Sequence, residues 1–347
     1  MGRSGSKPGG RGVLARHKAL IGLLGLACLL VGGVGVWAVS LSNQISAIPR
    51  MDLDLGSDIL EDPVLGTYDR PDAPDGDAAG SVNILIAGVD AGESARIGEV
   101  VQRDVWIPGE HRSDTIMVLH LSADRRNAYL ISVPRDTWVP IDGYGMAKIN
   151  AAFSYGGPPL FVRTLEQFTG LRLDHLVLVD WKGFMKLVDA LGGVEVHQQG
   201  SGLTRLDGEE ALDYVRERRS LPRGDLDRIN RQQNVVRSLS GELTSRKVLL
   251  DPLKLTEVLG VVTSSLAVDE SLTDGEIRRL ALSLRSLDGV AHMTVPVEGF
   301  GRVDGQSIVR VDTDKAKALF GAAVADELEE YTASYDVDTL PAPAEVD

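Results

Sequence analysis

The chain has 347 residues, of which 43% are hydrophobic, so it can bury a sizeable core as one large domain or two small ones. Its formal net charge of -14 argues against a generally basic surface of the kind that binds nucleic acid. Cys28 is the single cysteine, which excludes an intramolecular disulfide framework and a cysteine-based zinc site, and the six histidines are scattered without metal-ligand spacing.

The N-terminal region predicts a membrane anchor. Leu20 to Val39 is a run of about twenty residues without a charge, which is long enough to cross a bilayer. The basic residues before it place the N-terminus in the cytoplasm by the positive-inside rule, so the rest of the chain is expected outside the cell. A cleaved signal peptide with its site near Ala47 is the alternative, but the long apolar run favours an uncleaved anchor. We therefore expect a cytoplasmic basic tail at 1–19 and a single-pass signal anchor at 20–40 of a cell-membrane protein.

The segment 41–80 is rich in Asp, Pro and Gly and predicts a poorly ordered acidic stalk. The folded domain is expected to begin with an almost wholly apolar run from Ser81 to Gly88, which is typical of a strand buried on both faces. This strand ends at Asp90. The polar residues 91–110 are interpreted as a loop.

Residues 115–121 and 128–133 are rich in strand-forming residues and flank a turn-like segment, so they predict a hairpin. A hairpin centred between Asp124 and Arg125 would place Asp114 opposite Arg135. If the strand that ends at Asp90 runs parallel to the second hairpin strand, all three charged residues lie on one rim of the sheet, where α/β folds bind their ligands.

The following elements have the rhythm of a βαβ unit, which predicts a parallel sheet. A helix at 158–169 closed by Gly170 precedes a strand at 173–180, a helix at 181–191 and a strand at 194–196. Asp207 and Glu210 have the spacing of a capping box, so they are expected to begin the helix that carries Tyr214.

The C-terminal part is predicted to hold helices at 252–266, 273–287 and 313–325 and strands at 291–297 and 307–311. The catalytic domain would then span 81–325, followed by a frayed acidic tail at 326–347.

Between Arg216 and Arg231 this acidic chain gathers six arginines. At about 100° per residue, Asp225, Arg228 and Gln232 fall on the same helical stripe as the apolar residues of this segment. Buried donors need an acceptor, and guanidinium groups bind phosphate oxygens bidentately, so the stretch predicts an anion site. An internal salt-bridge network with Asp225, Glu217 and Asp227 is the alternative.

Six short motifs occur in an order that resembles the LytR-CpsA-Psr family. They are Gly88-Val89-Asp90, Arg112-Ser113-Asp114-Thr115, Ser132 to Thr137, Lys148-Ile149-Asn150, Tyr214 to Arg218 and Arg231-Gln232-Gln233. The resemblance covers about 81–241 and extends more loosely to 325. It implies an α/β fold, with a three-layer α/β/α domain that has a mixed central sheet and lies outside the membrane.

The resemblance also implies a reaction. Members of this family transfer an anionic glycopolymer from a polyprenyl (pyro)phosphate carrier onto peptidoglycan, forming a phosphodiester with the aid of Mg²⁺. The implied partners are a polyprenyl-linked glycopolymer, peptidoglycan and the membrane, with no nucleic acid.

Individual roles follow from matching the motifs. Asp90 and Asp114 look like the two magnesium-binding aspartates and, with Arg135, like the catalytic residues. The remaining residues look like the pyrophosphate-binding set: Arg135, Arg216, Arg218 and Gln232, with Lys148, Asp225 and Arg228 in support.

Outside this context the same residues have ordinary structural interpretations. The aspartates could cap turns or strand edges, Arg135 could pair with Asp136, and Lys148 could be a solvated amine.

The chain departs from the family pattern after Asp90, where it has a longer connection and lacks the common Ser-Arg pair. Arg96 or Arg103 could replace the missing arginine.

The prenyl tail requires an apolar tunnel, and ordinary core is the alternative for every candidate lining residue: Phe153, Phe161, Phe168, Leu176 and Phe184.

No nucleophile elbow is present, so the acceptor hydroxyl is expected to attack, with Asp90 as a hypothetical base. A polyprenyl-pyrophosphate phosphatase and a non-catalytic lipid-binding or regulatory envelope protein are the competing interpretations.

Overall fold

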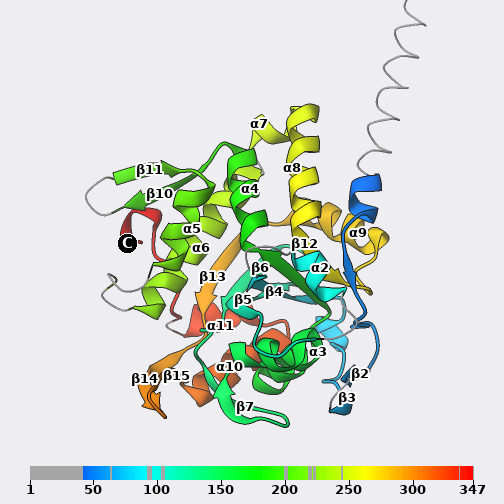
Figure 1. Cartoon of the computed structure of the whole chain (residues 1–347), viewed down its shortest axis with the longest axis vertical. Coiled ribbons are helices and arrows are strands. Elements are labelled where there is room, and N and C mark those ends of the chain that lie inside the picture. The colour runs from blue at the N-terminus through cyan, green and yellow to red at the C-terminus, as the bar shows by residue number, and fades with distance from the viewer. Residues whose placement is uncertain are drawn as a thin grey trace, which may run out of the picture. The chain divides into compact units, whose positions relative to one another are not determined.

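The computed structural model describes residues 42–62, 65–91, 96–102, 106–198, 202–217, 221, 224–243, 245–335 and 337–346 (Figure 1). The chain divides into two compact units, 1–46 and 47–347. Of the first unit, residues 42–46 are described, and they are helical. The predicted cytoplasmic tail and membrane anchor at 1–40 lie outside the described residues. Within the described ranges, no helix combines the length and the apolar character that a membrane crossing requires.

A mixed sheet forms the centre of the second unit, as expected. Its strands run in the order β1-β12-β9-β4-β5-β6-β13. Their bounds are β1 Arg50–Met51, β12 Leu266–Asp269, β9 His175–Asp180, β4 Val82–Asp90, β5 Arg112–Leu121, β6 Asn127–Ser132 and β13 Gly289–Thr294. β4 runs parallel to β9, and β6 to β13, whereas β5 is antiparallel to both of its neighbours.

The predicted hairpin register is confirmed. Leu121 pairs with Ala128 and Met117 pairs with Ser132, as a turn centred between Asp124 and Arg125 requires. Because β5 is antiparallel to both β4 and β6, the carboxyl ends of β4 and β6 share a rim with the beginning of β5. The strand pairing therefore brings Asp90, Asp114 and Arg135 to one edge of the sheet.

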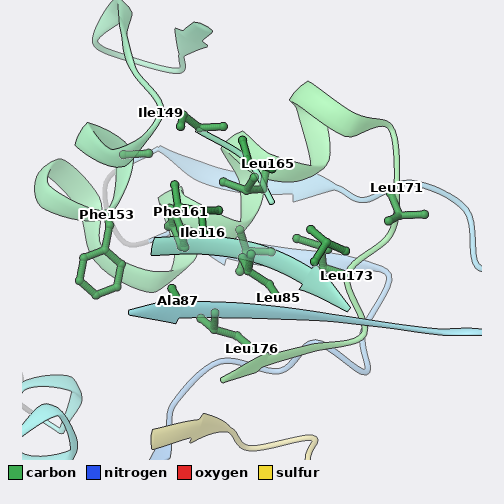
Figure 2. Packing of buried hydrophobic residues seen from close by; sticks show 14 of the residues in the cluster. Leu85, Ala87, Ile116, Ile149, Phe153, Phe161, Leu165, Leu171, Leu173 and Leu176 are labelled. Atoms are coloured by element: carbon green, nitrogen blue, oxygen red, sulfur yellow. The ribbon is translucent and has the colours of Figure 1, made fainter. Parts of the chain in front are cut away.

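One face of the sheet packs against α3 (Asn150–Thr169) and α10 (Thr313–Val324). Figure 2 shows side chains of α3, among them Phe161 and Leu165, above Leu85 and Ile116 of the strands. As predicted, Gly170 ends α3 in the left-handed conformation. Gly157 interrupts the helix with a φ of 69°, immediately before two prolines, so α3 consists of two helical segments joined at a kink.

Five helices of the described chain lie on the other face of the sheet. They are α4 (Trp181–Leu191), α5 (Gly208–Arg216), α6 (Asp225–Leu243), α7 (Arg246–Leu249) and α8 (Pro252–Ser265). Asp180 caps α4 by accepting a hydrogen bond from the Gly183 amide at 2.5 Å, and the predicted capping box of Asp207 and Glu210 begins α5. Alternate residues of β4 face the two layers, so helices cover both faces of the sheet.

The remaining elements complete the second unit. The helices are α2 (Ile97–Val101), α9 (Asp274–Ser283) and α11 (Leu328–Ser334), and the separate hairpins are β2 (Ile59–Asp62) with β3 (Gly66–Asp69), β7 (Trp138–Ile141) with β8 (Gly145–Lys148), β10 (Val194–Gln198) with β11 (Gly202–Leu206), and β14 (Val297–Val303) with β15 (Gln306–Val311). Short 3-10 helices occupy Gly76–Ala78, Leu284–Ser286 and Pro343–Glu345.

The predicted βαβ unit is wrong. The strand that follows α4 does not join the central sheet, because β10 pairs in an antiparallel hairpin with β11 and packs against α6. The position beside β9 is instead occupied by β12, which begins at Leu266, where the sequence predicted the end of a helix.

Parts of 47–62 and 65–80 pack against the domain where a stalk was expected. Met51, Leu53 and Leu55 are buried and alternate with exposed Asp52 and Asp54, which is the period of a strand with one buried face. β1 extends the sheet by pairing with β12. The high acid content therefore marks the solvent side of an ordered segment.

The C-terminal residues also pack where a frayed tail was expected. Leu328 and Tyr331 of α11 belong to the main core, and Val346 is buried. Asp326 accepts a hydrogen bond from the Ala123 amide at 2.9 Å, which ties this segment to the turn between β5 and β6.

A buried ion pair holds the N-terminal segment of this unit in place. Arg70 donates to Glu166 of α3 at 2.6 Å, and both side chains have an exposed fraction of 0%. Arg70 also donates to the carbonyl oxygens of Leu55 at 2.6 Å and Ser57 at 3.0 Å. The guanidinium thus satisfies backbone acceptors that would otherwise lose their partners on burial.

We predict that Glu166→Gln lowers the free energy of unfolding by about 3 to 5 kcal/mol, because it leaves the Arg70 charge buried without its counter-ion. Urea denaturation measures the change. The matched control is Glu276→Gln, which removes a carboxylate paired at 2.7 Å with Arg279, whose side chain is 76% exposed. This variant should change stability by less than about 1 kcal/mol. Equal losses in both variants would contradict the assigned role of the buried pair.

We predict that protonation of the buried His292 side chain of β13 lowers the stability of the fold in mild acid. Burial, aided by the charge of Arg237, lowers the pKa of His292 from 6.5 to about 4. Between these values the unfolded state binds more protons than the folded state, so stability falls as the pH drops from about 6.5 to about 4, by up to about 3 kcal/mol. The comparison of wild type with His292→Gln by thermal unfolding across this range measures the effect. An identical pH dependence in the two proteins would refute the prediction.

Candidate functional site

A polar cavity of about 250 Å³ opens at the predicted rim of the sheet. It is lined by Asp90, Asp114, Arg135, Trp181, Val215, Arg216, Arg228 and Gln232. These residues come from the end of β4, from β5, from the segment after β6, and from α4, α5 and α6. Six residues proposed from the sequence therefore meet in one place, although they are far apart along the chain.

The carboxylates of the cavity are paired with guanidinium groups. Asp114 accepts a hydrogen bond from Nη1 of Arg135, the partner that the hairpin register predicted. The Asp90 Oδ2 lies 3.9 Å from Nη2 of Arg216, and the two side chains are 52% and 44% exposed. The Nε of Arg135 has no hydrogen-bond acceptor among the described residues. Arg135 thus retains donor capacity beside the cavity.

α6 contributes the buried polar groups that its helical stripe predicted. Arg228 and Gln232 have exposed fractions of 4% and 7%, and Ile229 and Leu239 are buried with them. The Nε2 of Gln232 donates to the Val215 carbonyl at 3.4 Å, which links α6 to the end of α5. Arg228 thus places a guanidinium group, which can bind an anion, on the cavity wall.

Gln233 has a different role from its neighbour. Its side chain is fully buried and donates to Ser132 Oγ at 2.7 Å and to the Met293 carbonyl at 2.9 Å. These bonds fix α6 against the carboxyl ends of β6 and β13. Gln233 therefore sets the position of Arg228 and Gln232 relative to the sheet.

Trp181 is a site residue that the sequence analysis missed. The Arg216 guanidinium lies 5.0 Å from the centre of its ring, at cation–π distance. The indole N–H is buried and has no hydrogen-bond partner within the described ranges. Its position at the carboxyl end of β9, directly after the cap Asp180, was the available signal.

An apolar cavity of about 180 Å³ adjoins the polar one and shares Trp181, Val215 and Gln232 with it. It lies between one face of the sheet and helices α4 to α6. Its other lining residues are Ile86, Gly88, Thr115, Met117, Val179, Asp180, Phe184, Leu187, Val235, Val236 and Leu239. An elongated ligand in both cavities would have one apolar and one anionic part.

Of the candidate tunnel residues, Phe184 lines this cavity. Phe153, Phe161 and Leu176 are fully buried in the core on the opposite face of the sheet, where Figure 2 shows them. Phe168 packs against the same core, with its ring 6.0 Å from that of Phe320. Sequence did not distinguish these residues because both faces of the sheet are apolar.

Lys148 lies apart from the cavity for which it was proposed. In the β7–β8 hairpin it pairs with Trp138, and its Nζ lies 3.1 Å from Asp136 Oδ1. It lines a second polar cavity of about 470 Å³, and Arg135 is the residue common to the linings of the two polar cavities.

Four further predicted positions remain, of which two are described by the structure. Arg218 and Arg103 lie outside the described residues. Asp225 is the first residue of α6. Arg96 is exposed before α2 and is not among the residues that line the cavity.

The cavity fits a magnesium ion that keeps ligands from water or substrate. In the described part of the chain, no cluster of three or more acidic, histidine or cysteine side chains could enclose a metal alone. Asp90 and Asp114 provide two carboxylates on the wall of an open cavity. Mg²⁺ commonly binds through one or two carboxylates and completes its octahedron with water and phosphate oxygens.

The chemistry of the lining favours a phosphate-type ligand. Three guanidinium groups, those of Arg135, Arg216 and Arg228, face two carboxylates. Guanidinium forks bind phosphate oxygens bidentately, and a divalent ion on the carboxylates would bind the same oxygens.

Comparison with known proteins gives matches over most of the chain. A family model described as the LytR_cpsA_psr family matches residues 64–324. The chain is 33% identical over 317 residues to a probable cell wall biosynthesis protein LcpB of Corynebacterium glutamicum, covering 87% of this chain and 70% of the relative. It is 31% identical over 257 residues to the polyisoprenyl-teichoic acid–peptidoglycan teichoic acid transferase TagU of Enterococcus faecalis, covering 68% of this chain and 79% of the relative.

A solved structure shares the fold. It is a LytR-CPS2A-psr family protein, YwtF (TagT), with a bound octaprenyl pyrophosphate lipid. The TM-score is 0.53 at 22% identity, and the match covers 77% of this chain and 96% of that one.

Proposed function

The chain belongs to the LytR-CpsA-Psr family, and on this premise we propose that it transfers an anionic glycopolymer from a polyprenyl pyrophosphate carrier onto peptidoglycan, forming a phosphodiester. The observation that carries the proposal is the apolar cavity that continues into a cavity lined with guanidinium groups. A prenyl pyrophosphate has the same succession of an apolar tail and an anionic head. The lipid named for the TagT structure and the reaction named for TagU agree with this assignment.

In the proposed complex, the prenyl tail lies along Phe184 and Val236 of the apolar cavity and the pyrophosphate lies among Arg135, Arg216 and Arg228. These guanidinium groups bind the phosphate oxygens and stabilise the charge that develops on the leaving group. Asp90 and Asp114 would hold Mg²⁺, which when bound supplies further neutralisation of the phosphates.

The reaction joins the oxygen of an acceptor sugar hydroxyl to the phosphorus that carries the glycopolymer. The bond from that phosphorus to the bridging oxygen breaks, and polyprenyl monophosphate leaves. We assign the acceptor's proton to Asp90, because its half-exposed carboxylate lies on the cavity wall and is reachable from solvent. The anchor predicted at 20–40 would hold this site outside the cell, next to the membrane that contains the lipid carrier.

The decisive test is a transfer assay with the full chain in liposomes, a polyprenyl-pyrophosphate-linked glycopolymer and peptidoglycan. We expect a phosphodiester-linked product with Mg²⁺ and much less with EDTA. Release of polyprenyl monophosphate without any product on peptidoglycan would favour a phosphatase. Full activity of Asp90→Asn with bound Mg²⁺ would exclude Asp90 as the base.

We predict that Arg216→Ala weakens binding of polyprenyl pyrophosphate by about tenfold or more, because the loss of one charge-assisted hydrogen bond costs about 1.5 to 3 kcal/mol. The matched control is Arg205→Ala, since the Arg205 side chain is 39% exposed, close to the 44% of Arg216, but pairs with Glu195 and Glu242 away from the cavity. Lipid binding measured by microscale thermophoresis should distinguish the two variants. Equal affinities would contradict the placement of the pyrophosphate.

We predict that Val236→Trp abolishes discrimination between long and short prenyl chains. Val236 lines the apolar cavity, and an indole at this position would occupy space that the tail requires. Wild type should bind an octaprenyl pyrophosphate more tightly than a geranyl pyrophosphate, whereas the variant should bind them alike. An unchanged preference in a folded variant would place the tail elsewhere.

A further inference from the structure

The cavity of about 470 Å³ that contains Lys148 has no assigned ligand. Its walls come from the beginning of β5, the β7–β8 hairpin, the first turns of α3 and the turn between β14 and β15. The lining residues are Arg112, Arg135, Asp136, Trp138, Met146, Ala147, Lys148, Asn150, Ala151, Ser154, Tyr155, Asp304 and Gln306. It is larger than the pyrophosphate cavity, and the two share Arg135.

The lining differs in kind from that of a phosphate site. Trp138 and Tyr155 present aromatic surface, and Tyr155 is held by stacking on Tyr144 with ring centres 4.6 Å apart. Asn150 and Gln306 supply amides that can both donate and accept hydrogen bonds. Aromatic walls with a few amide groups suit the apolar face and the hydroxyl and acetamido groups of a sugar ring.

Cations at the same cavity indicate a saccharide with acidic substituents. Arg112 and Lys148 line it with Arg135, and the carboxylates of Asp136 and Asp304 line it as well. Asp136 is engaged by Lys148 at 3.1 Å and lies 4.0 Å from Nε of Arg135, so its carboxylate holds these two cations in place. A muramyl sugar that carries a peptide has both a sugar ring and carboxylates.

The position of the cavity favours the acceptor as its ligand, and not the lipid-linked donor. In phosphoryl transfer the attacking and leaving oxygens lie roughly in line. The leaving polyprenyl phosphate would lie on the side of Trp181 and Gln232, where the apolar cavity begins, whereas the larger cavity reaches the phosphates across Arg135. The linings of the apolar and the larger polar cavities have no residue in common.

We propose that this cavity binds the acceptor: a muramyl-peptide unit of peptidoglycan whose hydroxyl is directed past Arg135 at the phosphate. The assignment rests on the proposed function, and it gives Lys148 a role in binding the acceptor, separate from the pyrophosphate. Its substrate is a saccharide with acidic substituents, and Trp138, Tyr155 and Gln306 determine its specificity.

The test compares Gln306→Ala with Ser307→Ala, an exposed neighbour on the same strand that does not line the cavity. In the liposome assay with the full chain, Gln306→Ala should raise the KM for a soluble disaccharide-peptide acceptor about fivefold, as expected for one lost hydrogen bond, and leave the KM for the lipid-linked donor unchanged. Trp138→Leu should act in the same direction, and circular dichroism checks that it folds. A larger rise in the donor KM than in the acceptor KM would overturn the proposal.

A binding measurement separates this proposal from the proposed function. Saturation-transfer NMR with the full chain and the disaccharide-peptide alone, without any lipid donor, should show binding that persists in Arg216→Ala and is weakened in Gln306→Ala. Binding here, together with no product in the liposome transfer assay, would support the cavity assignment and refute the proposed transferase function. Lack of binding, or loss of the bound sugar when octaprenyl pyrophosphate without a glycopolymer is added, would overturn the cavity assignment while leaving the pyrophosphate site intact.

Discussion

The register of β5 against β6 is the constraint on which the site depends. One turn between these strands places Asp114 beside Arg135, and the antiparallel pairing of β4 with β5 brings Asp90 to the same rim. Because a slip by one residue would turn every side chain to the other face, a change in this turn would dismantle the cavity and not merely shift it. The buried faces of β4 and β5 specify the register, so the same apolar residues that stabilise the core also position the polar groups.

α6 also contributes to the wall of the cavity, and its two neighbouring glutamines make different contacts. The side-chain NH2 of Gln233 donates to groups of the sheet, whereas Arg228 and Gln232 line the cavity. The bonds of Gln233 anchor the helix within the fold, so the groups of α6 that line the cavity are positioned before a ligand arrives.

Three adjoining cavities form a sequence of chemical environments along the rim. The apolar cavity suits the tail, the guanidinium cavity suits two phosphates, and the larger polar cavity with aromatic walls suits a sugar. Trp181 lines both the apolar and the guanidinium cavity, and Arg135 lines both the guanidinium and the larger polar cavity. Arg135 lines both polar cavities, and its pairing with Asp114 and its position near Asp136 restrict its orientation.

The sequence by itself determined the local features. Short-range periodicity and capping chemistry located the β5–β6 hairpin, the Asp207–Glu210 box, the Gly170 helix end and the buried stripe of α6, because each depends on residues only a few positions apart. Six of the proposed site residues were named from the hairpin register, the helical stripe and the order of the family motifs. Only the tertiary structure decided that Met51, Leu53 and Leu55 belong to the core, that β12 and not β10 lies beside β9, that Lys148 faces a different cavity, and that Phe184 alone of the tunnel candidates lines the apolar cavity. These outcomes depend on which surfaces, distant along the chain, pack together. The spacing of apolar residues along the chain is the same whichever face of the sheet they pack against.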